Sequence, residues 1–284
     1  KPNPYHMKQL NASIKIGIIL ILLSNIIYSC KKDIDKSVIK KEKLSGYVQK
    51  GPYVNGTSIE MYELSSSLSQ TGKTFGTKIS DNKGSFEISN IALSSQYVEF
   101  SASGYYFNEF TGDISVAPLT LYALSDITNI ASVNVNILTH LEKDRVEYLV
   151  GKGKSFFSAK DSAQTEIMAI FGFSGNSMSH SENLDISQNK DENAVLLAIS
   201  LILQGDRSVG DLTELLANIS TDIKQDGILN SNSILTSLRN SSKLLNLSAI
   251  RTNLVKRYQD LGVSTSIPGF EKYINDFLAF TGQK

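Results

Sequence analysis

The hydrophobic pattern of the chain changes its period near residue 136, and this change constrains the fold more than any other feature. Between about residues 44 and 135, short alternating apolar runs are separated by Gly, Asn, Asp and Ser, which is typical of half-buried strands. From Val135 onward, apolar residues such as Ile137, Leu138 and Leu141 recur every three or four positions, which indicates helices. The 284 residues therefore predict a multidomain chain, β first and then α.

The β region, residues 44–135, is expected to hold eight short strands. Asp81-Asn82-Lys83-Gly84 is typical of a hairpin turn, with Gly84 supplying the positive φ. Short strands at near-regular spacing favour a small antiparallel β-sandwich. The expected strands cover residues 44–49, 57–64, 73–80, 85–91, 97–102, 105–111, 119–124 and 132–135.

Segments of this region resemble the carboxypeptidase regulatory-like family. Residues 45–48 (SGYV), 54–62 (VNGTSIEMY) and 80–88 (SDNKGSFEI) follow that family's order of strands and turns, and 98–105 (VEFSASGY) resembles its late strand. The resemblance covers about 65 residues and implies a transthyretin-like sandwich. It implies no activity, because the regulatory-like module has no catalytic residues to carry over.

Residues 136–284 are expected to form an all-α array of seven helices. Ser155 is placed to cap the second helix, and residues 194–199 are apolar on every side, which indicates a buried central helix. A long polar loop is expected at residues 171–188. The expected helices run from 137 to Gly151, from 156 to 170, and over 191–204, 211–223, 231–238, 247–261 and about 270–280.

The N-terminal stretch has the pattern of a signal peptide that ends at the only cysteine. Met7 is the expected start, which makes residues 1–6 non-native, and the uncharged core at 16–27 has 12 residues. A bilayer-spanning helix needs about 20 residues, whereas a secretory signal needs roughly 7–15. Ile27-Tyr28-Ser29-Cys30 resembles the lipobox of bacterial lipoproteins. The resemblance implies removal of residues 1–29, a diacylglycerol thioether on Cys30 and acylation of its amine, for example with palmitate.

Residues 30–43 are expected to form a lipidated tether between the membrane and the first strand. Lys31 stands where the lipoprotein family has Asp as its inner-membrane retention signal, which favours the outer membrane and leaves the leaflet open. The chain contains 28 basic and 28 acidic residues, so no net field recruits nucleic acid. A single cysteine also excludes an internal disulfide.

Aromatic residues are concentrated in the later strands of the β region. Tyr105 and Phe107 share a face of one expected strand, because successive side chains of a strand point to opposite sides. Together with Tyr122 they are candidates for a stacking surface that binds a sugar or a peptide. Packing inside the core is the alternative interpretation, since strands favour aromatic residues.

Few polar patterns suggest chemistry, and no metal or cofactor is expected. His140-Leu141-Glu142 has the His-x-Glu spacing of zinc deaminases but lacks their Pro-Cys-x-x-Cys partner, which favours a surface or capping histidine at 140. Asp222, Asp226 and Asn230 around Gly227 resemble a calcium loop with the wrong ligand spacing, which favours a turn between helices.

These observations predict a non-catalytic lipoprotein of the cell envelope that serves as an interaction or structural module at the outer membrane. Its expected partners are the membrane, through the lipid on Cys30, and an unidentified protein or glycan. Binding of a carbohydrate or peptide by the aromatic cluster is an alternative. An unrecognised hydrolase built on His140 or His180 is a second alternative, because spatial neighbours are not visible in a sequence.

Overall fold

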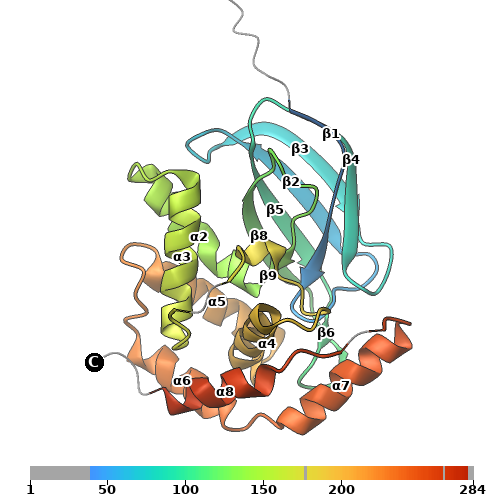
Figure 1. Ribbon diagram of the computed structural model, residues 1–284, viewed down its shortest axis with the longest axis vertical. Helices are drawn as coiled ribbons and strands as arrows, with labels where there is room; N and C mark the ends of the chain where they lie inside the picture. The colour runs from blue at the N-terminus through green and yellow to red at the C-terminus, as the bar shows by residue number, and fades with distance from the viewer. Residues whose placement is uncertain (1–38, 176–177, 265, 281–284) are drawn as a thin grey trace, which may run out of the picture. The chain divides into compact units, whose positions relative to one another are not determined.

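A computed structural model describes residues 39–175, 178–264 and 266–280 (Figure 1). The predictions for the signal peptide, for Cys30 and for residues 30–38 of the tether fall outside these ranges. Contacts group residues 38–284 into one compact unit. This unit has a β region followed by seven helices within the described ranges, as the change of period predicts.

Two sheets account for most of the β region. In the first, of order β4-β1-β9, β1 runs antiparallel to β4 and parallel to β9. The second, of order β3-β2-β5-β8, is antiparallel throughout, and β6 and β7 form a separate pair. The strands are β1 (Ile39–Gln49), β2 (Ser58–Leu64), β3 (Gln70–Lys78), β4 (Ser85–Leu93), β5 (Tyr97–Gly104), β6 (Phe107–Asn108), β7 (Asp113–Ile114), β8 (Leu119–Asp126) and β9 (Val135–Asn136).

Strand β1 begins five residues before the expected position, at Ile39 rather than Leu44. Residues 39–43, expected to be tether, pair with β4 in a register that joins Ile39 to Leu93. Lysines at 40, 41 and 43 made this segment resemble a solvated spacer. The charged side chains of this strand segment nevertheless have partners. Lys41 donates to the Ile130 carbonyl at 2.8 Å, and Lys43 forms an ion pair with Glu87.

The seven helices follow the predicted order with shifts of a few residues at their ends. Ser155 caps its helix as predicted by accepting a hydrogen bond from the Ser158 amide. Asn136 and Thr139 form a capping box where the β region ends, which explains the abrupt change from strand to helix. The helices are α2 (Ile137–Gly151), α3 (Phe156–Ile170), α4 (Asp191–Gln204), α5 (Val209–Ile223), α6 (Asn232–Ser242), α7 (Leu247–Asp260) and α8 (Phe270–Ala279).

Apolar side chains of both regions pack into one continuous core. Phe86 of β4 contacts Phe100 of β5, with ring centroids 5.9 Å apart, so the two sheets share an interior. Helix α4 is buried along almost its whole length, which confirms the predicted central helix. None of the helices in the described ranges is long and apolar enough to cross a membrane.

Helices α2 and α3 lie side by side next to the four-stranded sheet (Figure 1). The expected loop between α3 and α4 contains one turn of 3-10 helix, η1 (Ser181–Asn183), which contacts α2 and β9. The end of the sheet, the start of α3 and η1 thus approach one another although they are far apart in the sequence.

Candidate functional site

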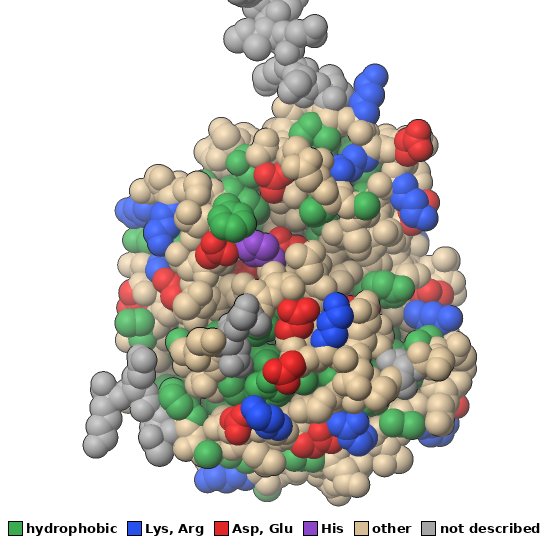
Figure 2. Space-filling view, in the orientation of Figure 1, with side chains coloured by type: hydrophobic (Ala, Val, Ile, Leu, Met, Phe, Trp, Pro, Cys, Tyr) green, Lys and Arg blue, Asp and Glu red, His purple; other side chains and the backbone are tan. Residues whose placement is uncertain are grey.

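A cleft of about 470 Å³ opens where these elements meet. The start of β5, the segment that follows β8, the start of α3 and η1 each contribute part of its wall. Acidic and hydrophobic side chains border a histidine on the face shown in Figure 2. The cleft is lined by Tyr97, Asp126, Thr128, Asn129, Ile130, Ser155, Phe156, Phe157, Lys160, His180, Glu182 and Asn183.

The inner wall of the cleft contains a buried lysine held by two carboxylates. Lys160 Nζ lies 2.6 Å from Glu142 Oε2 and 2.9 Å from Glu182 Oε2, and all three side chains are at least nine-tenths buried. We call these residues the Lys160 cluster. They come from α3, α2 and η1 respectively, so the cluster ties three separate elements together.

The Lys160 cluster contains one basic and two acidic side chains, and this imbalance affects the pKa values of Lys160 and Glu142. Burial alone would lower the pKa of Lys160, but the attraction of Glu142 and Glu182 outweighs burial and raises this pKa above its ordinary value. Burial raises the pKa of Glu142 despite the opposing attraction of Lys160, and the nearby Glu182 adds to the rise. One cation therefore faces two carboxylates in a place with little water.

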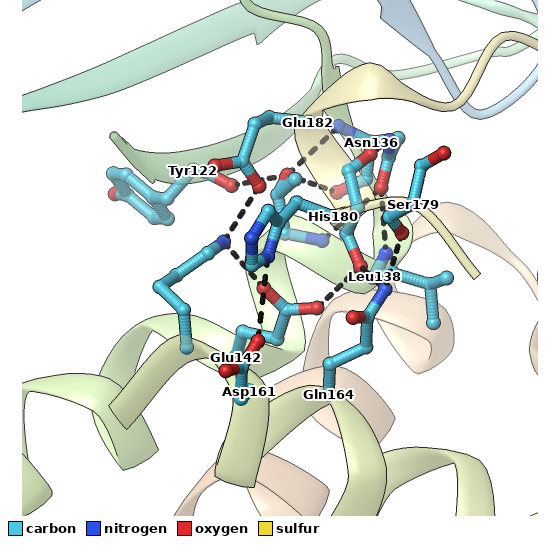
Figure 3. Close-up of polar contacts among 12 residues, drawn as sticks. Tyr122, Asn136, Leu138, Glu142, Asp161, Gln164, Ser179, His180 and Glu182 are labelled. Carbon is cyan, nitrogen blue, oxygen red and sulfur yellow. Dashed lines mark hydrogen bonds and ion pairs between the residues drawn. The ribbon is translucent and has the colours of Figure 1, made fainter. Parts of the chain in front are cut away.

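Hydrogen bonds around the Lys160 cluster hold η1 in place (Figure 3). The Ser181 hydroxyl donates to Glu142 Oε1 and accepts from Gln164 Nε2 at 3.2 Å. Asn136 Nδ2, at the start of α2, donates to the Ser181 carbonyl at 2.7 Å. Because the backbone of η1 is fixed from two sides, Glu182 is presented to the cleft in a defined position.

Aromatic rings form the outer part of the cleft. Tyr97 and Phe156 have ring centroids 4.9 Å apart, and Phe157 packs edge-on against His180 at 5.2 Å. Phe157 remains 64% exposed, which is unusual for a phenylalanine. At the rim, His180 Nδ1 lies 3.8 Å from Asp161 Oδ1. Apolar faces and polar groups thus surround the same space.

Two carboxylates stabilise the charged form of Lys160 and raise its pKa above the ordinary value, which favours an ion-pairing role over that of a base. No hydrogen bond between His180 and a serine hydroxyl is found within the described ranges, so the histidine is not part of an assembled triad there. Nor do the described residues include three or more His, Cys, Asp or Glu placed to hold a metal ion.

The three aromatic candidates of the sequence analysis lie in different environments. Tyr105 is 46% exposed, whereas Phe107 is only 4% exposed and is covered by the Arg257 guanidinium, 5.2 Å from its ring centre. Tyr122 stacks on His140 at 5.6 Å. Among the described side chains, no ring contact joins any two of the three. They do not form a common stacking face, because Phe107 turns into the core.

His140 is not the surface or capping residue that was expected. It stacks on Tyr122, its Nδ1 is buried without a hydrogen-bond partner, and burial lowers its pKa to about 4. Glu142, two residues later, belongs instead to the Lys160 cluster. The His-x-Glu pair is therefore divided between two environments by the twist of the helix.

The segment from Asp222 to Asn230 is a turn between helices, as the second interpretation proposed. Asp226 accepts hydrogen bonds from the Ile228 amide at 3.0 Å and from Asn230 Nδ2 at 3.1 Å. Gly227 adopts a φ of 77° and donates its amide to the Ile223 carbonyl. The carboxylates of this segment thus stabilise the turn.

Sequence reasoning missed the Lys160 cluster, although a signal for it exists. Lys160 lies four residues after Phe156, on the apolar stripe of α3, and Glu142 lies four residues after the buried Leu138 of α2. A charged residue at a core-facing position of a helix indicates a buried partner of opposite charge. Which partners meet could not be seen, because Glu182 comes from the loop after α3.

No family model matches this chain, and neither a curated protein nor a solved structure matches it. A role for the cleft therefore has to come from its own residues. The cleft has apolar rings around its opening and a fixed, charged inner wall.

Proposed function

We propose that this chain is a non-catalytic, lipid-anchored binding protein of the cell envelope, and that its cleft binds a sugar ring. The observation that carries the proposal is the convergence of Tyr97, Phe156 and Phe157 with polar side chains around one cleft. Ligand sites are typically concave, about 300–1,000 Å³ in volume, and lined by apolar rings with a few placed polar groups.

The two kinds of wall match the two kinds of surface on a pyranose. Its C–H groups form an apolar face that packs on an aromatic ring, and its hydroxyls need hydrogen-bond donors and acceptors. Asn129 and Asn183 supply amide groups that can both donate and accept. The exposed Phe157 ring, which costs free energy to leave in water, gains most from being covered.

The Lys160 cluster supports a binding role for the cleft. Burying three charges carries a desolvation cost that apolar side chains of similar size would avoid. Retaining such a cluster is easier to understand if it presents Glu182 to a ligand than if it only joins helices. The charged state of Lys160 also favours binding without catalysis.

We further propose that the β region is a regulatory-like, transthyretin-like sandwich and that the chain is anchored through Cys30, with the outer membrane favoured. Support comes from the motif order in residues 45–105 and from the lipobox pattern. Intact-mass analysis of protein purified from membranes tests the anchor. We expect a mass without residues 1–29 and with acyl chains, and a retained leader or an unmodified Cys30 would contradict the proposal.

The binding proposal is tested with the full chain in detergent against a panel of soluble oligosaccharides, with affinity measured by titration calorimetry. Phe157→Ala should weaken binding about 3- to 10-fold, because a stacked ring contributes roughly 0.5–1.5 kcal/mol. Stability should hardly change, since the side chain is exposed.

Leu244→Ala is the matched control, because it removes an exposed apolar side chain after α6, away from the cleft lining. It should leave binding unchanged. If no saccharide binds, or if both variants lose affinity equally, the cleft is not a sugar site.

A further inference from the structure

We propose that the sugar selected by the cleft carries a free amine, which is protonated and binds at Glu182. This inference rests on the proposed function and adds the class of ligand to it. Asp126 and Glu182 line the cleft and Asp161 lies at its rim, whereas Lys160 is the one basic side chain other than histidine among the described lining residues.

The positive charge of Lys160 is already paired within the protein. Two carboxylates, Glu142 and Glu182, contact its ammonium group, which leaves the Lys160 cluster with an excess of negative charge. Two further lysines lie close by and also have partners: Lys41 donates to the carbonyls of the cleft-lining Thr128 and Ile130, and Lys154 is bound to the Ser162 hydroxyl at 2.9 Å. A neutral ligand would leave this excess in place, and an anionic ligand would be repelled by it.

Glu182 has unused capacity to accept hydrogen bonds. Its side chain is only 10% exposed, and its Oε2 touches Lys160 Nζ at 2.9 Å without a hydrogen bond of good geometry. Neither carboxylate oxygen accepts a hydrogen bond from another described side chain, whereas Glu142 accepts from both Lys160 and Ser181. A carboxylate has about four lone-pair positions, so a buried one in this state calls for a further donor.

A ligand ammonium group supplies what is missing. It brings three N–H donors and one positive charge, and hydrogen bonds between charged partners are stronger than neutral ones. The rings of Tyr97 and Phe157 add to the attraction, because the face of an aromatic ring attracts a cation. A protonated amino sugar presents this charge next to a ring that the same aromatics can stack against.

The test compares three tetrasaccharides that differ at one position: the β-1,4-linked tetramers of glucosamine, N-acetylglucosamine and glucose. The first carries ammonium groups, the second has the same nitrogen without charge, and the third has a hydroxyl. We expect the full chain in detergent to bind the glucosamine tetramer about tenfold more tightly than the other two.

Variants then locate the charge. Glu182→Gln should reduce the preference for the amine, measured as the ratio of the affinity for the glucosamine tetramer to the affinity for the glucose tetramer. Asp161→Asn, at the exposed rim, should reduce the preference for the amine to a smaller degree, and it should leave the fold intact because the side chain is exposed. Glu87→Gln is the matched control, because Glu87 is an exposed carboxylate on β4, outside the cleft.

The outcomes separate the two proposals. Equal affinity for the three tetramers would overturn the inference and leave sugar binding standing. Absence of binding to all three would overturn both. Should Glu182→Gln fail to fold, the comparison of tetramers on the unaltered chain and the Asp161→Asn variant still decide the matter.

Discussion

Two buried lysines of this chain are treated differently by their surroundings. Lys50, just after β1, pairs with Glu109 at 2.6 Å, and both side chains are fully buried. We call this the Lys50 pair. Burial lowers the pKa of Lys50 and raises the pKa of Glu109, so both shift toward their neutral forms. Lys160, with two carboxylates, shifts in the opposite direction and stays charged.

The difference follows from the number of partners and from access to water. The Lys50 pair is sealed between the sheet region and the helices, where the Lys50 ammonium also lies over the Tyr106 ring and the Ser200 hydroxyl donates to the Lys50 carbonyl. The Lys160 cluster forms part of the cleft wall. Buried charge therefore has two uses in one molecule: the Lys50 pair joins two regions, and the Lys160 cluster presents a carboxylate.

The largest expected effect comes from removing one member of the Lys50 pair. Lys50→Met leaves Glu109 buried without a counter-ion, which should lower the free energy of unfolding by about 3–5 kcal/mol. Lys160→Met should cost less, about 2–3 kcal/mol, because Glu182 lines the cleft and water there can solvate it once Lys160 is gone, although Glu142 stays buried. Urea denaturation of the full chain, followed by circular dichroism, measures both.

A double variant serves as the control for this comparison. Lys50→Met with Glu109→Leu removes both charges, so most of the lost stability should return. Equal losses in the two single variants would contradict the distinction between a sealed pair and an open cluster. So would a double variant as unstable as Lys50→Met alone.

Much of the fold could be predicted because local periodicity decides it. Helix α4 matched its predicted range, and Ser155 capped α3 as expected. The start of β1 was missed because residues 40–43 are all charged and become a strand only by pairing with β4. The strand expected at residues 105–111 is limited to Phe107–Asn108, because Tyr106 forms only an isolated bridge to Tyr53 and residues 109–112 form a turn.

The candidate site was far less predictable than the fold. Glu142, Lys160 and Glu182 meet only after two helices and a loop have packed, and no spacing rule connects their positions. Aromatic composition pointed to the correct kind of side chain but to other residues. Tyr97 belongs to the aromatic-rich later strands of the β region but was not among the candidates, whereas Phe156 and Phe157 belong to the helical region.

His140 sharpens the comparison because its half-buried ring, with Nδ1 fully buried, has no ion-pair partner among the described residues. Its pKa is lowered to about 4 from 6.5, mainly by burial, with Asp144 opposing this shift and Lys143 adding to it. The unfolded chain therefore takes up a proton near pH 6.5 while the folded chain does not. Stability supplied by the neutral ring is present above pH 6.5 and is lost as the pH falls to about 4.

Replacing His140 by Phe keeps a ring beside Tyr122 and removes the titration. Between pH 7 and pH 4.5 the unaltered chain should lose about 2 kcal/mol more stability than the His140→Phe variant, measured from urea midpoints. Carboxylates such as Glu142, whose raised pKa favours the folded state at low pH, act equally in both proteins and cancel in the difference. Identical pH profiles would show that water or a counter-charge reaches His140. It would then no longer be an unpaired reference for the Lys50 pair and the Lys160 cluster.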